Sequence, residues 1–280
     1  MIKISLLMVF AFLGQIFTSS ANVKVEKDIN YGSSTNDPNR QLNVYYPADV
    51  ATTKEVLIFI HGGSWSSGKK ETYWWLGRNF ARKGVVTVIV NYRLAPNAEF
   101  HQMGLDCAEA VKWVYANIGR YGGDLRKIFV MGHSAGGHLA ELINADPQYF
   151  NSVGLKNPIK GVILNDAFGL DMHEYLNIAE KDDSYRDFLR TFSTHPETWT
   201  LGSPLHYIEN IRNPQLIFYG ARTYPAIQIQ SKRLDSLLLA KQVKTELHVI
   251  KHKKHVGMIS QMIFGANQLY QIILNFMKVN

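Results

Sequence analysis

The sequence predicts an α/β protein in which a mostly parallel, doubly wound β-sheet has helices on both faces. Short apolar runs without polar alternation, typical of strands buried on both faces, recur along the chain. Between them lie segments with apolar residues at three- and four-residue spacing, typical of amphipathic helices. The 280 residues are 46% hydrophobic and 19% charged, which suits one sizeable domain and excludes a disordered or collagen-like chain.

Eight segments are predicted to be strands. The first two flank a turn-rich stretch at residues 33–38 with no helix between them, so we expect an antiparallel edge. Each of the other six is a continuous apolar run, which is typical of the interior of a parallel sheet. The predicted strands are residues 23–29, 41–46, 56–60, 85–90, 128–131, 162–164, 216–219 and 247–250.

The helical segments alternate with these strands, which implies right-handed crossovers between parallel strands. The predicted helices are residues 72–83, 101–118, 138–145, 227–241 and 259–277. Residues 169–213, after the sixth strand, interrupt this alternation with aromatic and charged side chains but no buried strand. An interval of that length is often functional, so it predicts a short helical insertion that could act as a lid; helices that only cover the sheet are an equal alternative.

The N-terminus resembles a secretory signal peptide. Lys3 precedes an apolar run at residues 4–14, and Ser-Ser-Ala at residues 19–21 supplies the small side chains of a cleavage site. The apolar run is shorter than the roughly 20 residues that span a bilayer, which argues against a membrane anchor. We therefore expect a signal peptide at 1–21, a single α/β domain at 22–280, and a secreted or periplasmic protein without a stable membrane anchor after cleavage.

Charge and ligand patterns argue against several kinds of partner. The formal net charge of +7 is spread along the chain, and no nucleic-acid module accompanies it, so no nucleic-acid partner is expected. The single cysteine, Cys107, cannot form an internal disulfide and lies on the apolar side of a predicted helix, as a buried thiol would. The pair His252 and His255 lacks accompanying carboxylate or cysteine ligands, so no metal is predicted. The sequence makes no prediction of oligomeric state.

The strongest chemical signal is Gly-His-Ser-Ala-Gly at residues 132–136. It follows an apolar strand and precedes a helix, as the nucleophile elbow of serine hydrolases does. The glycines are needed because a turn this sharp leaves no space for side chains beside the serine. We therefore expect Ser134 to be the nucleophile.

A second motif, His-Gly-Gly-Ser-Trp at residues 61–65, ends the third predicted strand. Its glycines allow backbone amides to point at one oxygen atom, so Gly62 and Gly63, with Ala135 after the nucleophile, are the predicted oxyanion hole. Residues 63–69 also fit the pattern G-x-x-x-x-G-K of a phosphate-binding loop. The residue that should follow is Ser or Thr, but here it is Lys70, which excludes that alternative.

The general base should be a histidine beyond the last strand, because the triad order is serine, acid, histidine in such enzymes. His255 follows residues 247–250, and Gly257 leaves the loop free to turn back. His252 is the alternative, although it comes soon after the strand. We expect His255 to be the base.

Several motifs together resemble the carboxylesterase branch of the α/β-hydrolases. This branch includes aryl-formamidase-like, isoprenylcysteine-methylesterase-like and bacterial feruloyl/acetyl-esterase-like enzymes. The resemblance is dense from residue 42 to 142. It implies the α/β-hydrolase fold and a cofactor-free acyl hydrolase with a Ser–His–acid triad. The motifs are Tyr-Tyr-Pro at 45–47, Asn-Tyr-Arg-Leu-Ala-Pro at 91–96, Tyr-Gly-Gly-Asp at 121–124 and the two glycine motifs above.

The acid of the triad is where the chain departs from this family. The resembling enzymes carry it as G-x-x-D after a strand, and in that register this chain has Gly220 and Thr223. Asp166, directly after the strand at 162–164, preserves the order of the triad and resembles an arrangement in some lipases of the fold. Asp166 is the favoured acid, while Asp171, or no acid at all, remains open.

The predicted function is hydrolysis of a small-molecule carboxylic ester. Two alternatives stay open: an amidase of the aryl-formamidase type, and a weakly active or binding-only relative that lacks the triad acid.

Overall fold

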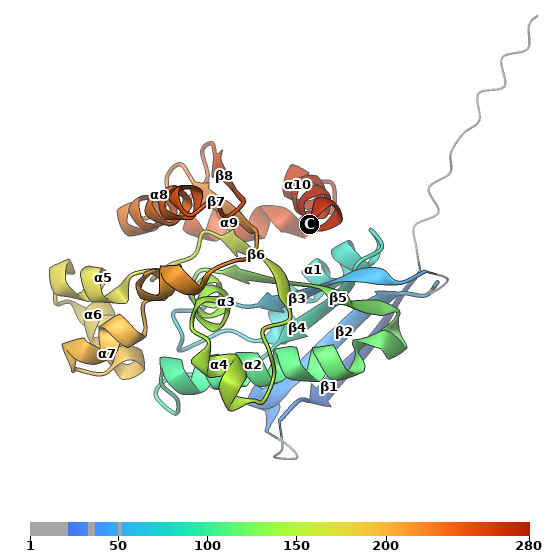
Figure 1. The fold of residues 1–280 in the computed structure, drawn as a ribbon, viewed down its shortest axis with the longest axis horizontal. Coiled ribbons are helices and arrows are strands. Elements are labelled where there is room, and N and C mark those ends of the chain that lie inside the picture. Colours follow the sequence, from blue (N-terminus) through green and yellow to red (C-terminus); the bar gives the residue numbers. More distant parts are fainter. Residues whose placement is uncertain (1–21, 33–36, 50–51) are drawn as a thin grey trace, which may run out of the picture.

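The computed structural model describes residues 22–32, 37–49 and 52–280. The expected signal peptide, residues 1–21, lies outside the described residues. Within them, one eight-stranded sheet forms the centre of the molecule, in the order β1-β2-β4-β3-β5-β6-β7-β8 (Figure 1). The strands are β1 Val23–Asn30, β2 Gln41–Pro47, β3 Lys54–Ile60, β4 Val86–Val90, β5 Gly123–His133, β6 Ile159–Asn165, β7 Gln215–Gly220 and β8 Thr245–Ile250.

The direction of the strands confirms the predicted sheet. β2 is antiparallel to both β1 and β4, and every other neighbouring pair is parallel. β8 differs from its prediction as a strand buried on both faces, because all six of its residues are partly or fully exposed. The cause is its place at the end of the sheet, where only β7 lies beside it.

Helices cover both faces of the sheet (Figure 1). Along β3, Val56, Ile58 and Ile60 belong to one hydrophobic cluster, whereas Leu57 and Phe59 belong to the other, as the two-residue period of a strand requires. The first cluster includes residues of α2 Phe100–Asn117, α3 Ala135–Ala145, α4 Gln148–Ser152 and α8 Pro225–Ala240. The second includes residues of α1 Trp74–Ala81, α9 His255–Ser260 and α10 Gln268–Val279.

Two predicted helices differ from the structure by more than two residues at one end or in their continuity. α3 starts at Ala135, directly after Ser134, instead of at His138, because the elbow leads straight into the helix. The helix predicted at residues 259–277 is instead divided into α9, a short 3₁₀ turn at Gln261–Ile263, and α10. The break is fixed by Asn267, whose side chain accepts a hydrogen bond from the amide of Leu269 and so caps α10.

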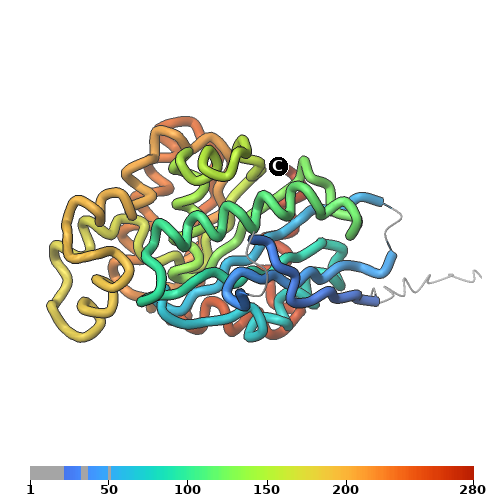
Figure 2. The backbone as a smooth tube through the Cα atoms, turned by 90° about the horizontal axis from the view of Figure 1, so that it is seen from below, coloured from blue at the N-terminus to red at the C-terminus, as the bar shows by residue number. Residues whose placement is uncertain are grey.

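The interval at 169–213 forms a separate helical group. Figure 2 shows its helices, in yellow to orange, together at one end of the molecule. They are α5 Met172–Ile178, α6 Asp183–Phe192, α7 Pro196–Leu201 and a 3₁₀ segment at Pro204–Asn210. Trp65, from the loop after β3, is fully buried against Phe188 and Phe192 of α6, so the group packs on the end of the sheet where β3 and β5 finish.

Among the described residues, no helix combines the length and apolar character needed to cross a bilayer. Cys107 is buried in α2, and this burial raises the pKa of its thiol well above the usual value.

Candidate active site

Ser134 occupies the sharp turn between β5 and α3. Its backbone has φ 55° and ψ −125°, a conformation that costs energy for any residue with a side chain. The flanking glycines make the turn feasible. A Cβ on Gly132 would lie 2.1 Å from the carbonyl oxygen of Gly136, and one on Gly136 would lie 2.1 Å from that of Ile60. The turn presents a nearly buried hydroxyl at the end of the sheet.

His255, the first residue of α9, lies beside this hydroxyl. Its Nε2 is 2.8 Å from Ser134 Oγ, and its side chain is 17% exposed. The alternative base, His252, is an exposed residue in the turn after β8. The structure therefore brings His255, and not His252, to the serine.

The ring of His133 stacks on His255, with ring centroids 4.9 Å apart, and its Nε2 lies 3.3 Å from the His255 carbonyl oxygen. Burial lowers the pKa of His133 to about 4, so this neighbour is neutral at pH 7. His133 therefore supports the position of His255 without adding a positive charge that would oppose its protonation.

Asp166 completes the hydrogen-bonded chain. It follows β6 directly, is fully buried, and places Oδ2 2.6 Å from His255 Nδ1. Two further donors reach the same carboxylate. The amide of Gly220 donates to Oδ1 at 2.8 Å, and the hydroxyl of Thr223 donates to Oδ2 at 2.5 Å. Three donors on one buried carboxylate stabilise its negative charge and fix its orientation.

The contact of Thr223 with Asp166 was not predicted from the sequence. Thr223 stands in the register where the resembling enzymes carry their acid, so from the sequence alone it indicates only a missing carboxylate. In the structure its hydroxyl donates to the carboxylate that comes from the neighbouring strand. The available signal was the combination of an aspartate after one strand and a hydroxyl residue after the next.

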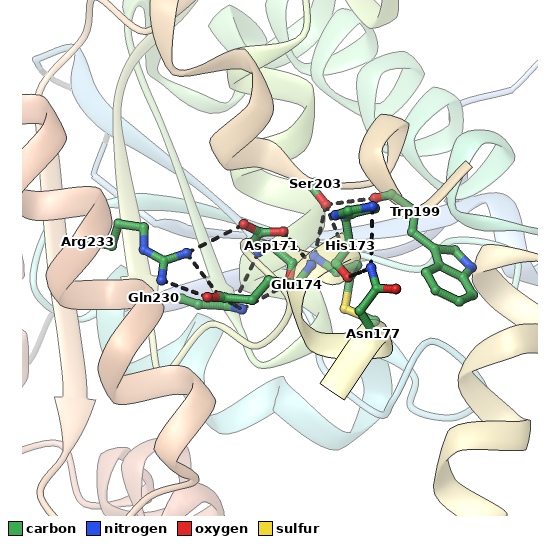
Figure 3. Close-up of polar contacts among 9 residues, drawn as sticks. Asp171, His173, Glu174, Asn177, Trp199, Ser203, Gln230 and Arg233 are labelled. Atoms are coloured by element: carbon green, nitrogen blue, oxygen red, sulfur yellow. Dashed lines mark hydrogen bonds and ion pairs between the residues drawn. The ribbon is translucent and has the colours of Figure 1, made fainter. Parts of the chain in front are cut away.

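Asp171, the alternative acid, has a different place. It is the N-cap of α5, where its Oδ1 accepts a hydrogen bond from the amide of Glu174 at 2.8 Å. Its other carboxylate oxygen pairs with Arg233 of α8 at 3.5 Å. Figure 3 shows this network, which joins α5, α8 and Ser203, and His255 is not among its members.

The loop after β3 lies against Ser134. A Cβ on Gly62 would be 2.7 Å from the carbonyl oxygen of His133 and 3.0 Å from Ser134 Cβ, so only glycine fits here without a shift of the backbone. Gly63 has a φ of 131°, and Ser64 and Trp65 also have positive φ, which turns the loop sharply past the serine. The amide of Ala135 directly follows the serine, at the N-terminus of α3, where helix geometry favours negative charge.

A cavity of about 220 Å³ opens at the serine. Aromatic rings from the elements after β6 and from the loop before α8 form much of its wall, and the insertion contributes side chains from α5 and α6. The lining residues are Ser64, Trp65, Ser134, Phe168, Tyr175, Ser184, Phe188, Tyr224 and His255. Among the described residues, no group of three or more His, Cys, Asp or Glu side chains is arranged to hold a metal ion.

Comparison with known proteins identifies the family. The family model BD-FAE matches residues 42–238, which is more than half of the chain. The chain belongs to the BD-FAE family. The match includes the nucleophile elbow and the glycine loop after β3, and it ends within α8, before His255.

This BD-FAE chain is also similar to individual esterases. Isoprenylcysteine α-carbonyl methylesterase ICME of Arabidopsis thaliana is 26% identical over 291 residues, which cover 97% of this chain and 66% of that protein. Esterase LipC of Mycobacterium tuberculosis is 33% identical over 200 residues, covering 66% of this chain and 49% of that protein. The chain thus spans about two thirds of the length of the first relative and about half of the second.

A solved structure of esterase B from Lactobacillus rhamnosis superimposes with a TM-score of 0.77 at 22% identity, covering 92% of this chain and 85% of that one. This likeness confirms the predicted α/β-hydrolase fold, and the family match confirms the resemblance inferred from the motifs.

Proposed function

We propose that this chain is a serine hydrolase that cleaves carboxylic esters. The observation that carries the proposal is the continuous set of contacts from Ser134 Oγ to His255 Nε2 at 2.8 Å and from His255 Nδ1 to Asp166 Oδ2 at 2.6 Å. This is the arrangement that activates a serine hydroxyl in acyl-transfer enzymes. The esterase names of the relatives support the same reaction class.

The partners of His255 favour one tautomer of its ring. A carboxylate can only accept hydrogen bonds, so His255 Nδ1 carries the proton and donates the hydrogen bond to Asp166. His255 Nε2 is then free to accept the proton of the Ser134 hydroxyl. Asp166 thus holds the imidazole in the tautomer that can act as a base, and it stabilises the imidazolium once this forms.

The first half of the reaction forms an acyl-enzyme. Ser134 Oγ attacks the carbonyl carbon of the ester as its proton moves to His255 Nε2, and the carbonyl electron pair moves to the oxygen. Amides of Gly62, Gly63 and Ala135 donate to this oxyanion. The carbon–oxygen bond to the alcohol then breaks, and His255 returns the proton to the departing alcohol oxygen.

Water completes the cycle. His255 takes a proton from a water molecule as its oxygen adds to the acyl-enzyme carbonyl, and the same amides hold the second oxyanion. The bond to Ser134 Oγ breaks, Oγ regains a proton from His255, and a carboxylic acid is released. No step needs a cofactor. An amidase of the aryl-formamidase type would use the same steps, with an amine as the leaving group.

The binding-only alternative loses its main support in this geometry. It depends on the lack of a carboxylate at Thr223, the usual acid position, whereas Asp166, after the neighbouring strand, lies within hydrogen-bond distance of His255.

Replacement of Ser134 by alanine tests the proposal directly. We expect Ser134→Ala to reduce the hydrolysis of p-nitrophenyl acetate by about 10⁶-fold, because the triad acts as a unit, and to abolish labelling by a fluorophosphonate probe. Ser236→Ala, on the exposed side of α8, is the matched control and should behave as the wild type. Equal turnover by wild type and Ser134→Ala would exclude a serine mechanism at this site.

We also propose that the protein is exported, on the basis of the signal-peptide pattern at residues 1–21. The start of β1 at Val23, directly after the expected cleavage site, supports this proposal. Mass spectrometry of the native protein should find an N-terminus near Asn22 in an extracytoplasmic fraction. An intact N-terminus on cytoplasmic protein would contradict it.

A further inference from the structure

A second cavity, of about 340 Å³, lies beside the pocket that contains Ser134. It is formed between α5 and the start of α8. Three aromatic residues, Phe168, Tyr175 and Tyr224, line both cavities, so the two spaces share a wall. Tyr224 also contacts the ring of His255, with centroids 5.3 Å apart, which places this wall next to the reacting atoms.

The rim of the second cavity exposes large apolar side chains to solvent. Ile178 is 78% exposed, Tyr224 57% and Ile229 54%, and all three line the same space. Single exposed apolar residues are common on proteins, but a group around a cavity indicates a surface that binds an apolar partner.

Two polar side chains of this lining, Glu174 and Gln230, have their polar groups engaged with neighbouring residues, as Figure 3 shows. Both carboxylate oxygens of Glu174 accept from Arg233, at 2.7 and 2.9 Å. The amide of Gln230 donates to the backbone oxygen of Asp171 at 2.9 Å and accepts from its backbone nitrogen at 3.0 Å. Apart from the phenol rings of Tyr175 and Tyr224, a ligand in the cavity would therefore meet apolar atoms.

The same contacts hold the two walls of the cavity together. Glu174 belongs to α5, and Arg233 and Gln230 belong to α8, so the network fixes the separation of the two helices. A cavity with such a brace is preformed, which lowers the entropic cost of binding.

We propose that this cavity is a substrate subsite that takes an apolar group of the ester, an alkyl chain or an aryl ring. The proposal rests on the esterase function proposed above and adds a preference to it. Its volume of about 340 Å³ exceeds the roughly 150 Å³ of a cavity that accepts benzene. The apolar group can belong to the acyl or the alcohol part of the ester, and substrates can distinguish the two.

Three esters provide that distinction. Ethyl acetate is small on both sides of the ester bond. Ethyl hexanoate and hexyl acetate are isomers that add the same methylene groups to the acyl side and to the alcohol side, respectively. Each methylene buried in an apolar site favours binding about fourfold. In the wild type we therefore expect kcat/KM for one of the two isomers to exceed that for ethyl acetate by at least about tenfold.

Filling the cavity should remove this preference. Ala226 lines the cavity from the first turn of α8, and Ala226→Trp places an indole ring there. Ala240→Trp, on the exposed last residue of the same helix, is the matched control. The preference is measured as the ratio of kcat/KM for the preferred isomer to kcat/KM for ethyl acetate. We expect Ala226→Trp to lower this ratio by about tenfold, while kcat/KM for ethyl acetate itself stays within about twofold of the wild type. Ala240→Trp should keep the wild-type ratio.

A second pair of variants tests the same subsite by charge instead of volume. Ile229→Asp puts a carboxylate on the rim of the cavity. Leu239→Asp is the matched control, because Leu239 is an apolar residue of α8 that does not line the cavity. The two native side chains are similarly exposed, at 54% for Ile229 and 59% for Leu239. Only Ile229→Asp should reduce the ratio.

The outcomes separate this proposal from the proposed function. Unchanged ratios for both isomers in Ala226→Trp and Ile229→Asp, with normal fluorophosphonate labelling and normal hydrolysis of ethyl acetate, would overturn the subsite and leave the esterase intact. A wild-type protein that neither labels nor hydrolyses any of the three esters would overturn the esterase function itself.

Discussion

Two carboxyl groups, Asp166 and Glu141, are both fully buried, but their surroundings differ completely. Asp166 accepts hydrogen bonds from His255, Thr223 and the amide of Gly220. Glu141, in the helix that starts after Ser134, receives one long hydrogen bond, 3.4 Å, from Asn144, and its Oε2 has no partner among the described residues. Burial raises the pKa of Glu141 to about 8.

The difference shows that burial alone does not determine what a carboxyl group can do. Desolvation penalises the charged form in both places, and only donors aimed at the oxygens compensate for it. Glu141 therefore holds its proton at neutral pH and behaves as a neutral part of the core. Asp166 has the donors that a charged partner of an imidazolium needs.

The largest expected effect on activity comes from removing the negative charge of Asp166. Asp166→Asn should lower kcat for ester hydrolysis by about 10³- to 10⁴-fold with little change in KM, because the amide neither selects the right tautomer of His255 nor stabilises the imidazolium. Steady-state kinetics with p-nitrophenyl acetate measure both constants.

Asp171→Asn is the matched control, since it removes the alternative acid. Asp171 caps α5 and pairs with Arg233, so this change should cost some stability and at most about a threefold change in kcat. Equal losses in the two variants, or a neutral Asp166→Asn, would show that the contact between Asp166 and His255 is not used in catalysis.

A smaller effect on kcat is expected when a hydrogen-bond donor to the Asp166 carboxylate is removed. Thr223→Val keeps the shape of the side chain and removes its hydroxyl, so it should lower kcat about tenfold, the size of one hydrogen bond to a charged group. Thr223→Ser restores the hydroxyl and should recover most of the activity. If Thr223→Val and Thr223→Ser have the same kcat, the hydroxyl has no part in positioning Asp166.

For Glu141 the expected change is in the stability of the fold and not in activity. Since the folded pKa of Glu141, about 8, is above its unfolded value of 4.5, the folded state keeps a proton that the unfolded state releases. The free energy of unfolding therefore falls as pH rises from 4.5 to 8, by up to about 1.4 kcal/mol per pH unit from this group. Glu141→Gln should remove that part of the slope.

Urea denaturation at pH 5.5, 7 and 8.5 measures the effect. The exposed Glu180→Gln is the control and should follow the wild type. Parallel pH curves for the wild type and Glu141→Gln would mean that Glu141 is ionised in the folded protein.

Local patterns predicted most of the fold and much of the candidate site. The strands were predicted from short apolar runs. The elbow at Ser134 was predicted from its glycines, where a Cβ would collide with backbone a few residues away or on the adjacent strand. The order of triad members along the chain favoured His255 and Asp166, and the structure places both side chains in one chain of contacts with Ser134.

Contacts between distant elements could not be predicted in this way. The hydrogen bond from Thr223 to Asp166 depends on β6 and β7 being neighbours, and a sequence does not state how two strand ends face each other. The brace between Glu174 and Arg233 joins residues far apart in the chain. The break before α10 was missed because the periodic apolar pattern continues across it, although Asn267 marks a new helix start.

The backbone at two of the three candidate triad residues places folding and catalysis in opposition. Ser134 and Asp166 have φ values of 55° and 54°, in a region where glycine has no steric penalty. At Ser134, glycine would relax the backbone and remove the nucleophile, whereas at Asp166 it would also leave three donors without their buried acceptor. A library of this protein selected only for heat resistance would therefore be drawn toward glycine at 134, and the gain in melting temperature there would be a loss of the enzyme.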